Sequence, residues 1–257
     1  MEPEELKVAR EGYSYVPARL VRVTSQPQVG DIAWGSLTLR PDAPEDWPKR
    51  KARHSSWKLD EFHGVLLQSK KDDDLLHGLL SVVFWGFASG SDGVLRIKRA
   101  IARVNWIVGG RGSIPAQPKA DIIVHLHAAR ELLISGQFAA ALLQAEEIQF
   151  LQIAFASKIL AFMHPFKTAV YDEVISHRLQ GYQDIELRRM YVSTEYPRSS
   201  RQSRQQSEIF SRWCHWCFNK ATELNSLGRA FNWKDWDGVI HEWRAVDVER
   251  AFFSLGR

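Results

Sequence analysis

Residues 146–179 read EEIQFLQIAFASKILAFMHPFKTAVYDEVISHRL, and this stretch decides the fold predicted for the chain. Two apolar segments, 148–155 and 159–162, have the spacing of helical faces. Lys158 is expected in the first turn of the second of these helices. Asp172 follows Lys158 by fourteen positions and is expected at the start of a third helix.

The run Ala154-Phe155-Ala156-Ser157-Lys158, followed by Val170-Tyr171-Asp172, resembles the helix-hairpin-helix of DNA glycosylases, in particular their 8-oxoguanine DNA glycosylase-like bacterial branch. In that family a Gly-x-Gly hairpin is followed at once by a catalytic lysine, and an aspartate opens a later helix. Alanines stand here in place of both hairpin glycines. A weaker similarity extends from about residue 75 to the end, where residues 243–251 resemble the closing helix of these proteins.

The resemblance implies a mainly α fold, a helix-hairpin-helix DNA glycosylase-like bundle over residues 57–257 with the motif at about residues 146–163. It implies an enzyme that flips a damaged or modified base out of double-stranded DNA and excises it. Lys158 would be the nucleophile and Asp172 its electrostatic partner, without cofactor or metal. The base would be an 8-oxoguanine-like purine, or a modified base in foreign or phage DNA, so that repair and defence both remain open.

A lysine at position 158 suits covalent base excision. The sugar develops positive charge as the base leaves, and a neutral amine can attack C1′ and form a Schiff base, after which strand cleavage at the abasic site can follow. Burial among Phe155, Ile159 and Phe162 would favour the neutral amine, because a low-dielectric surrounding disfavours the ammonium form. The alternative is a surface lysine on an amphipathic helix.

Asp172 has two compatible interpretations. As a carboxylate it can stabilise the positive sugar, orient the amine or activate water. As a preferred N-cap residue it can simply begin the helix that contains Val174, Ile175 and Leu179.

Predicted DNA contacts are of two kinds. The hairpin would offer backbone N–H groups to a phosphate, through Ala154, Phe155, Ala156 and Ser157. Basic side chains would follow the duplex backbone, and the predicted set is Lys167, Arg178, Arg188, Arg189, Arg201 and Arg204. The alternatives are a short loop between core helices and a solvated helix face.

Base flipping requires a pocket with aromatic faces for the extruded base. The predicted lining is Trp85, Phe162, His164 and Tyr171. Aromatic residues at helical spacing usually belong to the core, so packing is the alternative for each of them.

The two cysteines, Cys214 and Cys217, cannot supply the four ligands of a zinc or iron–sulfur site, and we expect buried helical thiols. They also imply no disulfide framework, which favours a reducing compartment. The polar start MEPEELKVAR does not fit a secretory signal, and the apolar run 75–88 is shorter than the roughly 20 residues that span a bilayer.

The composition is that of a soluble globular protein, with 45% hydrophobic and 25% charged residues. A net charge of +4 and a pI of about 9.1 permit a nucleic-acid partner without requiring one. We expect a monomer in the bacterial cytoplasm, associated with the nucleoid and not with a membrane.

Residues 1–56 are predicted to form an N-terminal extension, partly β, in which segments 13–24 and 32–39 pair across the turn at 27–30. A basic loop with Lys49, Arg50, Lys51 and Arg53 follows. From Ser56 onward helical periodicity takes over, after a serine N-cap candidate, with an acidic helix start at Asp72, Asp73 and Asp74 and a break at Gly90, Ser91 and Asp92. Further helices are predicted at 94–108, 121–133, 138–148, 209–224 and 246–252, and Pro165 is expected to end the helix that contains Lys158.

A second class of function stays open, a non-catalytic DNA-binding or scaffold protein that keeps the helix-hairpin-helix fold without its chemistry. The alanine hairpin favours it. A helical protein-interaction module that does not bind DNA is the third interpretation.

Overall fold

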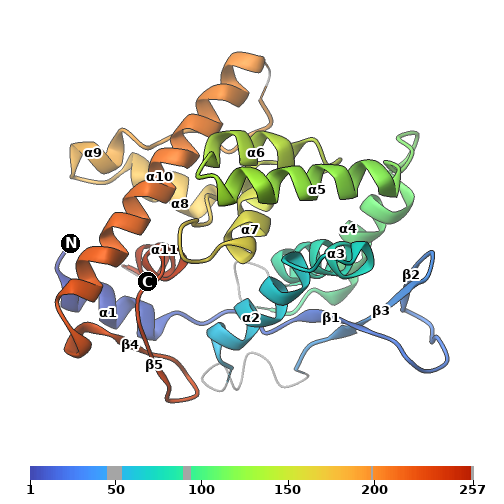
Figure 1. The fold of residues 1–257 in the computed structure, drawn as a ribbon, viewed down its shortest axis with the longest axis horizontal. Coiled ribbons are helices and arrows are strands. Elements are labelled where there is room, and N and C mark those ends of the chain that lie inside the picture. Colours follow the sequence, from blue (N-terminus) through green and yellow to red (C-terminus); the bar gives the residue numbers. More distant parts are fainter. Residues whose placement is uncertain (45–53, 89–93, 198, 256–257) are drawn as a thin grey trace. The chain divides into compact units, whose positions relative to one another are not determined.

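The computed structural model describes residues 1–44, 54–88, 94–197 and 199–255. It confirms a mainly α protein with small sheets (Figure 1). The basic loop with Lys49, Arg50, Lys51 and Arg53 lies outside the described residues, as does the helix break at residues 90–92.

The chain divides into two compact units. Unit 1 comprises Met1–Tyr13, His125–Glu147 and Leu151–Arg257, and unit 2 comprises Ser14–Val124 and Ile148–Phe150. This division does not follow the predicted boundary between residues 56 and 57, because the first thirteen residues belong with the C-terminal half of the chain.

Unit 2 begins with a three-stranded antiparallel sheet in the order β1-β3-β2, formed by β1(Arg19–Arg22), β2(Ile32–Trp34) and β3(Leu37–Asp42). The predicted pairing of 13–24 with 32–39 was therefore only partly right. A turn at Gly35, with a φ of +66°, splits the second segment, and β1 pairs with β3 instead of β2. That positive φ is readily adopted by glycine alone.

In unit 2, helices α2(Ser56–Leu67) and α4(Ile97–Gly109) pack on one apolar helix, α3(Asp72–Ala88). Its residues from Leu75 to Trp85 are all buried, and its three aspartates form the first turn, as predicted. Ser55 caps the preceding helix, which confirms the predicted serine N-cap, since its Oγ accepts the Lys58 N–H at 3.1 Å. Helix α5(Lys119–Ile134) continues into unit 1.

Unit 1 is organised around the long helix α10(Ser200–Ser226), against which α6(Phe138–Glu146) and α11(Ala245–Ser254) pack (Figure 1). Helix α7(Ile153–Met163) packs on α6, and α1(Pro3–Gly12) packs on α11. The remaining elements are shorter: α8(Glu173–Gln180), α9(Ile185–Arg188), η2(Arg229–Phe231), β4(Trp233–Lys234) and β5(Ile240–His241). Pro165 lies just beyond the end of α7, as predicted.

A buried cluster of charges joins the two ends of the chain inside unit 1. Arg10 of α1 donates from Nε and Nη2 to Asp247 Oδ1 at 3.0 and 2.8 Å, and Arg244 donates from Nε to Asp247 Oδ2 at 2.7 Å. All three side chains are at most 3% exposed. The Arg10 guanidinium also lies 3.5 Å from the ring centroid of Trp233. Burial alone would raise the pKa of Asp247, but Arg244 and Arg10 outweigh it and hold that pKa well below its usual range.

We predict that Asp247→Asn destabilises the protein by about 3–5 kcal/mol, because two buried guanidinium groups lose their counter-charge. Urea unfolding followed by circular dichroism measures it. Glu186→Gln is the control: its ion pair with Arg189 leaves the two side chains 71% and 68% exposed, and we expect a change of no more than about 1 kcal/mol. Equal effects of the two substitutions would contradict the role given to Asp247.

Candidate active site

Lys158 lies in the second turn of α7, one turn later than predicted, because the helix begins at Ile153. Its side chain is 12% exposed. The Nζ donates to Asp172 Oδ2 at 3.0 Å and to the Ala154 carbonyl at 3.3 Å, and it lies 5.6 Å from the ring centroid of Phe155. The Lys158 side chain is therefore mostly buried, and a small part of it is exposed to solvent.

Asp172 performs the capping role that was predicted for it. Its Oδ1 accepts the N–H groups of Val174 and Ile175 at 3.2 and 3.3 Å, so the side chain is the N-cap of α8. Its Oδ2 receives Lys158. Burial would raise the pKa of Asp172, but the Lys158 charge and the hydrogen bonds from Lys158 and the two backbone groups lower it, so the group is a carboxylate at neutral pH.

The connection between α7 and α8 is fixed by hydrogen bonds on both sides, which sets the distance between the lysine and the aspartate. Ser157 Oγ accepts the Tyr171 N–H at 3.0 Å. Trp213 of α10 donates from Nε1 to the Val170 carbonyl at 2.9 Å, and Thr168 donates from Oγ1 to the Leu160 carbonyl at 2.8 Å. The pair is therefore held by buried neighbours and not by its own attraction alone.

A third ionisable group at this place was missed from the sequence. Glu249 of α11 is 4% exposed, and its charge interacts with those of Asp172 and Lys158. Burial, followed by the Asp172 carboxylate, raises the pKa of Glu249 to about 8. The available signal was a glutamate on a helix whose other positions, such as Val246, Val248 and Ala251, are apolar.

The connection between the two helices lies earlier in the chain than the predicted hairpin. The connection between α6 and α7 covers residues 147–152, whereas Ala154, Phe155, Ala156 and Ser157 are helical. Ala156 and Ser157 are completely buried, so their predicted contact with a phosphate is wrong for this conformation. The residue with the left-handed backbone is Phe150, at a φ of +67°, a conformation that is strained for a bulky side chain.

Most predicted basic contacts are on the surface. Lys167, Arg188, Arg189, Arg201 and Arg204 are exposed. Arg189 is paired with Glu186 at 2.8 Å, and the half-buried Arg178 donates to the Leu255 carbonyl. Arg178 therefore has a partner within the fold, and its contact with DNA stays a prediction together with that of the exposed set.

The residues predicted to line a base pocket are mostly core residues. Tyr171 is fully buried, its hydroxyl lies 2.9 Å from the Met190 carbonyl, and burial raises its pKa to about 12. Phe162 is 3% exposed. Neither offers a free ring face, which corrects their assignment and favours the packing alternative.

The other two predicted pocket residues differ from each other. His164 is half-buried at the end of α7, where burial and then Lys167 lower its pKa, so its ring is neutral at pH 7. Trp85 belongs to unit 2, where it is 9% exposed and packs edge-on against Tyr15 at 5.2 Å.

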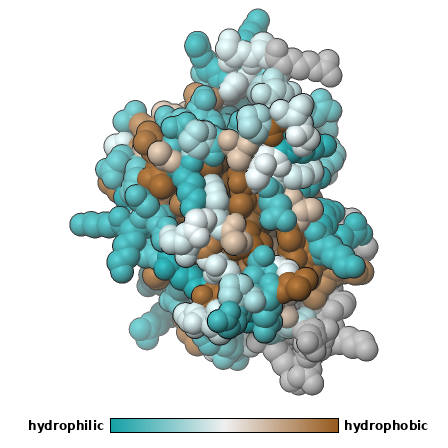
Figure 2. Space-filling model, turned by 90° about the vertical axis from the view of Figure 1, so that its right-hand side faces the viewer, coloured by the Kyte–Doolittle hydropathy of each residue, from teal (hydrophilic) through white to brown (hydrophobic). Residues whose placement is uncertain are grey.

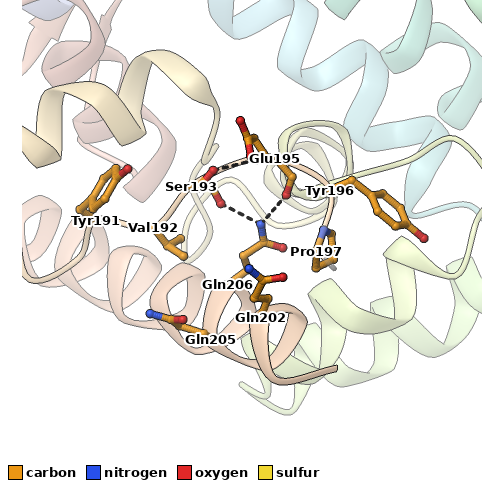
Figure 3. A pocket seen from close by; sticks show the side chains of 9 residues that line it. All are labelled: Tyr191, Val192, Ser193, Glu195, Tyr196, Pro197, Gln202, Gln205 and Gln206. Carbon is orange, nitrogen blue, oxygen red and sulfur yellow. Dashed lines mark hydrogen bonds between the residues drawn. The ribbon is translucent and has the colours of Figure 1, made fainter. Parts of the chain in front are cut away.

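A cavity of about 260 Å³ opens between the segment 191–197 and the start of α10 (Figure 3). Gln206 donates from Nε2 to the carbonyls of Ser193 and Glu195 at 2.7 and 2.8 Å, which fixes one wall. None of the four predicted pocket residues lines it. The lining is Tyr191, Val192, Ser193, Glu195, Tyr196, Pro197, Gln202, Gln205 and Gln206.

Two groups of side chains contain residue types that can bind metal ions: the two cysteines and a cluster near the β4–β5 turn. Cys214 and Cys217 are free, fully buried thiols of α10 whose pKa values are raised by burial, as predicted for packed cysteines. Sequence analysis missed Asp235, Asp237 and His241 around the β4–β5 turn, whose potential ligand atoms lie within 4.8 Å of one another. Asp235 and Asp237 also accept the N–H groups of Trp236 and Val239, so the turn itself accounts for their placement.

On the face drawn in Figure 2, apolar residues lie in groups among hydrophilic ones. Exposed large apolar side chains come from many different elements, for example Val124, Phe166 and Ile240, and such scattered residues need no partner. Within the part of the chain that the structure describes, every helix is too short or too polar to cross a bilayer.

No protein-family model, curated protein or solved structure matches the chain. The case for a function therefore depends on the side chains themselves.

The raised pKa of Glu249 predicts a stability effect that depends on pH. Between the ordinary pKa of a glutamate and about 8, the unfolded chain ionises while the buried group stays protonated, so the parent loses stability as the pH rises. Glu249→Gln removes this loss. We expect the variant to match the parent near pH 5 and to exceed it near pH 8 by on the order of 2 kcal/mol or more. Urea unfolding at both pH values measures it, and a variant less stable than the parent at pH 8 would contradict the burial effect.

Proposed function

We propose that this protein is a DNA glycosylase of helix-hairpin-helix type, in which Lys158 attacks the sugar of an extruded nucleotide and Asp172 stabilises the charge that develops. The observation that carries the proposal is the part-buried ion pair between Lys158 Nζ and Asp172 Oδ2 at 3.0 Å. The order of elements, α6, a six-residue loop, α7 with the lysine and α8 opened by the aspartate, supports it.

The chemistry follows from the two groups. As the bond between base and C1′ breaks, its electron pair leaves with the base and positive charge develops on the sugar. The Asp172 carboxylate, fixed at the start of α8, is placed to stabilise that charge. The Lys158 amine, once it has lost a proton, bonds to C1′, and opening of the sugar gives a Schiff base. Elimination of the phosphate from that intermediate would cleave the strand.

DNA contact would come from two sources. The exposed set Lys167, Arg188, Arg189, Arg201 and Arg204 offers cations for phosphates along the duplex. The start of α7 offers backbone N–H groups, since the side chain of its N-cap, Gln152, is exposed and makes no capping hydrogen bond. The partner would be double-stranded DNA that carries an 8-oxoguanine-like purine or another modified base.

Covalent trapping tests the nucleophile. We predict that borohydride reduces an adduct between the parent protein and abasic-site DNA, and that Lys158→Ala lowers its yield at least about 100-fold, because the attacking amine is gone. Lys220→Ala is a matched control, since Lys220 is 15% exposed, is paired with Glu223 at 2.7 Å and lies on α10. The control should trap as the parent does.

If the parent protein forms no adduct and releases no base from a panel of modified oligonucleotides, the proposal of an enzyme is contradicted. A non-catalytic DNA-binding protein is then favoured. Negligible DNA affinity at low salt would contradict both and favour a protein-interaction module.

Asp172→Asn tests the carboxylate. Asparagine is also a preferred N-cap, so α8 should keep its start while the negative charge is lost. We predict a fall in single-turnover base release of about 100-fold or more with DNA affinity within about twofold of the parent. Base release is measured on a modified oligonucleotide, and affinity by fluorescence anisotropy. Unchanged base release would show that the aspartate only caps the helix.

A further inference from the structure

Three arginines of unit 2 gather on two aromatic rings, at helix α4 and the turn that follows it. The Arg103 Cζ lies 3.8 Å from the ring centroid of Trp106 and 5.0 Å from that of Phe87. The Arg111 Cζ lies 4.1 Å from the same Trp106 centroid, and the Arg99 Cζ lies 5.5 Å from the Phe87 centroid. Each guanidinium is within the range of cation–π attraction, and Arg103 links the two rings. We call Arg99, Arg103 and Arg111 the arginine cluster.

The arginine cluster lacks an acidic counterpart within the part of the chain that the structure describes. Residues 94–120 contain six Lys or Arg and no Asp or Glu, so the local sequence supplies no counter-charge. Among the described residues no carboxylate forms an ion pair with Arg99, Arg103 or Arg111. Burial, followed by the charges of Arg111 and Arg99, lowers the pKa of Arg103, so the three cations repel one another. An anion bound among them would offset that repulsion.

Other arginines of unit 2 are paired, which sets the cluster apart. Arg19 donates to Asp42 at 2.8 Å, and Arg22 to Asp74 at 2.7 Å. Arg19 also lies 4.8 Å from the ring centroid of Phe62, so it combines an aromatic neighbour with a carboxylate. Contact with a ring therefore does not by itself leave an arginine without a counter-charge in this unit.

The backbone around the arginine cluster fixes its cations and rings. Gly110 has a φ of +82°, and a side chain there would collide with the Ile114 carbonyl oxygen. Arg111 and Ile114 exchange two backbone hydrogen bonds, at 2.9 and 3.0 Å, so Arg111 lies on a closed turn directly after α4. Phe150, the residue with the strained backbone, lies 6.0 Å from Trp106 between ring centroids. The cations are thus positioned in advance, which lowers the ordering cost of binding.

The chemistry of the arginine cluster suits phosphate groups. A guanidinium that lies on a ring uses its face, while its five N–H donors point outward in the plane and can bind a phosphate with two parallel hydrogen bonds. Arg99 and Arg111 are exposed and Arg103 is half-buried, so a ligand can reach these donors. Arg99 and Arg103 are about 6 Å apart along the helix axis, and a DNA strand carries a phosphate about every 3.4 Å. One strand can therefore contact several of the arginines.

We propose that the arginine cluster binds the phosphate backbone of DNA, as a contact surface of unit 2 that is separate from the basic residues predicted in unit 1. The inference rests on the proposed function for its choice of DNA as the polyanion, but it does not depend on the chemistry of Lys158. Phosphate contacts carry no sequence information. The cluster should therefore contribute equally to the binding of modified and unmodified duplexes.

The test is the affinity of the full chain for a short unmodified DNA duplex, measured by fluorescence anisotropy over a range of salt concentrations. For the double variant Arg99→Gln/Arg111→Gln we expect a loss of at least about tenfold in affinity at low salt. The slope of log affinity against log salt should become shallower by about two, because each lost phosphate contact removes roughly 0.9 from it. Arg99→Lys/Arg111→Lys keeps both charges and should keep most of the slope.

The matched control is Arg19→Gln/Arg22→Gln. It changes the net charge of unit 2 by the same amount, but Asp42 and Asp74 already neutralise these two arginines. We expect its affinity to stay within about twofold of the parent. Circular dichroism checks that each variant folds. If the cluster variant does not fold, the single changes Arg99→Gln and Arg111→Gln decide, and each should make the slope shallower by about one.

Several results would overturn the inference. One is a cluster variant with the affinity and salt slope of the parent, and another is an equal loss in the control, which would reduce the effect to net charge. A third is tight binding of the parent to vesicles of phosphatidylserine and phosphatidylcholine in equal parts, lost in the cluster variant while DNA affinity is kept. That result would assign the surface to a membrane.

The outcomes also separate the two proposals. If the parent forms no covalent adduct with abasic-site DNA while the cluster variant loses DNA affinity, the proposed function fails and the inference holds. If the parent is trapped on abasic-site DNA while the cluster variant binds DNA as the parent does, the inference alone fails.

Discussion

The carboxylate of Asp172 meets two demands at once, and the site depends on this constraint. One oxygen caps α8 by accepting two backbone N–H groups, and the other receives the ammonium of Lys158 from α7. Capping fixes the orientation of the carboxylate, so the lysine meets an acceptor that cannot rotate away. The same double use places the helix start and the charge partner on one residue.

Unit 1 places its buried carboxyl groups in three different charge environments. Asp247 is neutralised by Arg10 and Arg244, and Asp172 by Lys158 and two backbone groups. Glu249 has neither and is neutral at pH 7 because burial and Asp172 raise its pKa. The first arrangement holds the chain ends together. The other two carboxyl groups interact electrostatically with each other and with Lys158.

Much of the fold could be predicted from the sequence because its signals are local. The acidic start of α3 and the aspartate that opens α8 were identified from propensity and capping alone. The register of α7 was misjudged by one turn, because the small residues Ala154, Ala156 and Ser157 suggested a bend where they allow close packing. The predicted strand 32–39 missed its break at Gly35, since a single glycine inside an alternating pattern is a weak turn signal.

The site was predictable only where two residues lie in one motif. Lys158 and Asp172 are fourteen positions apart and meet as expected, although the motif alone could not decide between an ion pair and two separate roles. Glu249 is about ninety positions from Lys158, and the contact of Arg10 with Asp247 spans 237 positions. Such pairs depend on how helices pack, which spacing along the chain does not encode.

The central claim is that the Lys158 amine is the reacting group, and the most direct measurement of it is the identity of the residue that carries the sugar after reduction. Digestion of the trapped complex, followed by tandem mass spectrometry, locates the modified lysine. The account predicts the reduced sugar fragment on Lys158. A fragment on another amine, such as Lys167 or the chain's N-terminus, with Lys158 unmodified, would contradict it.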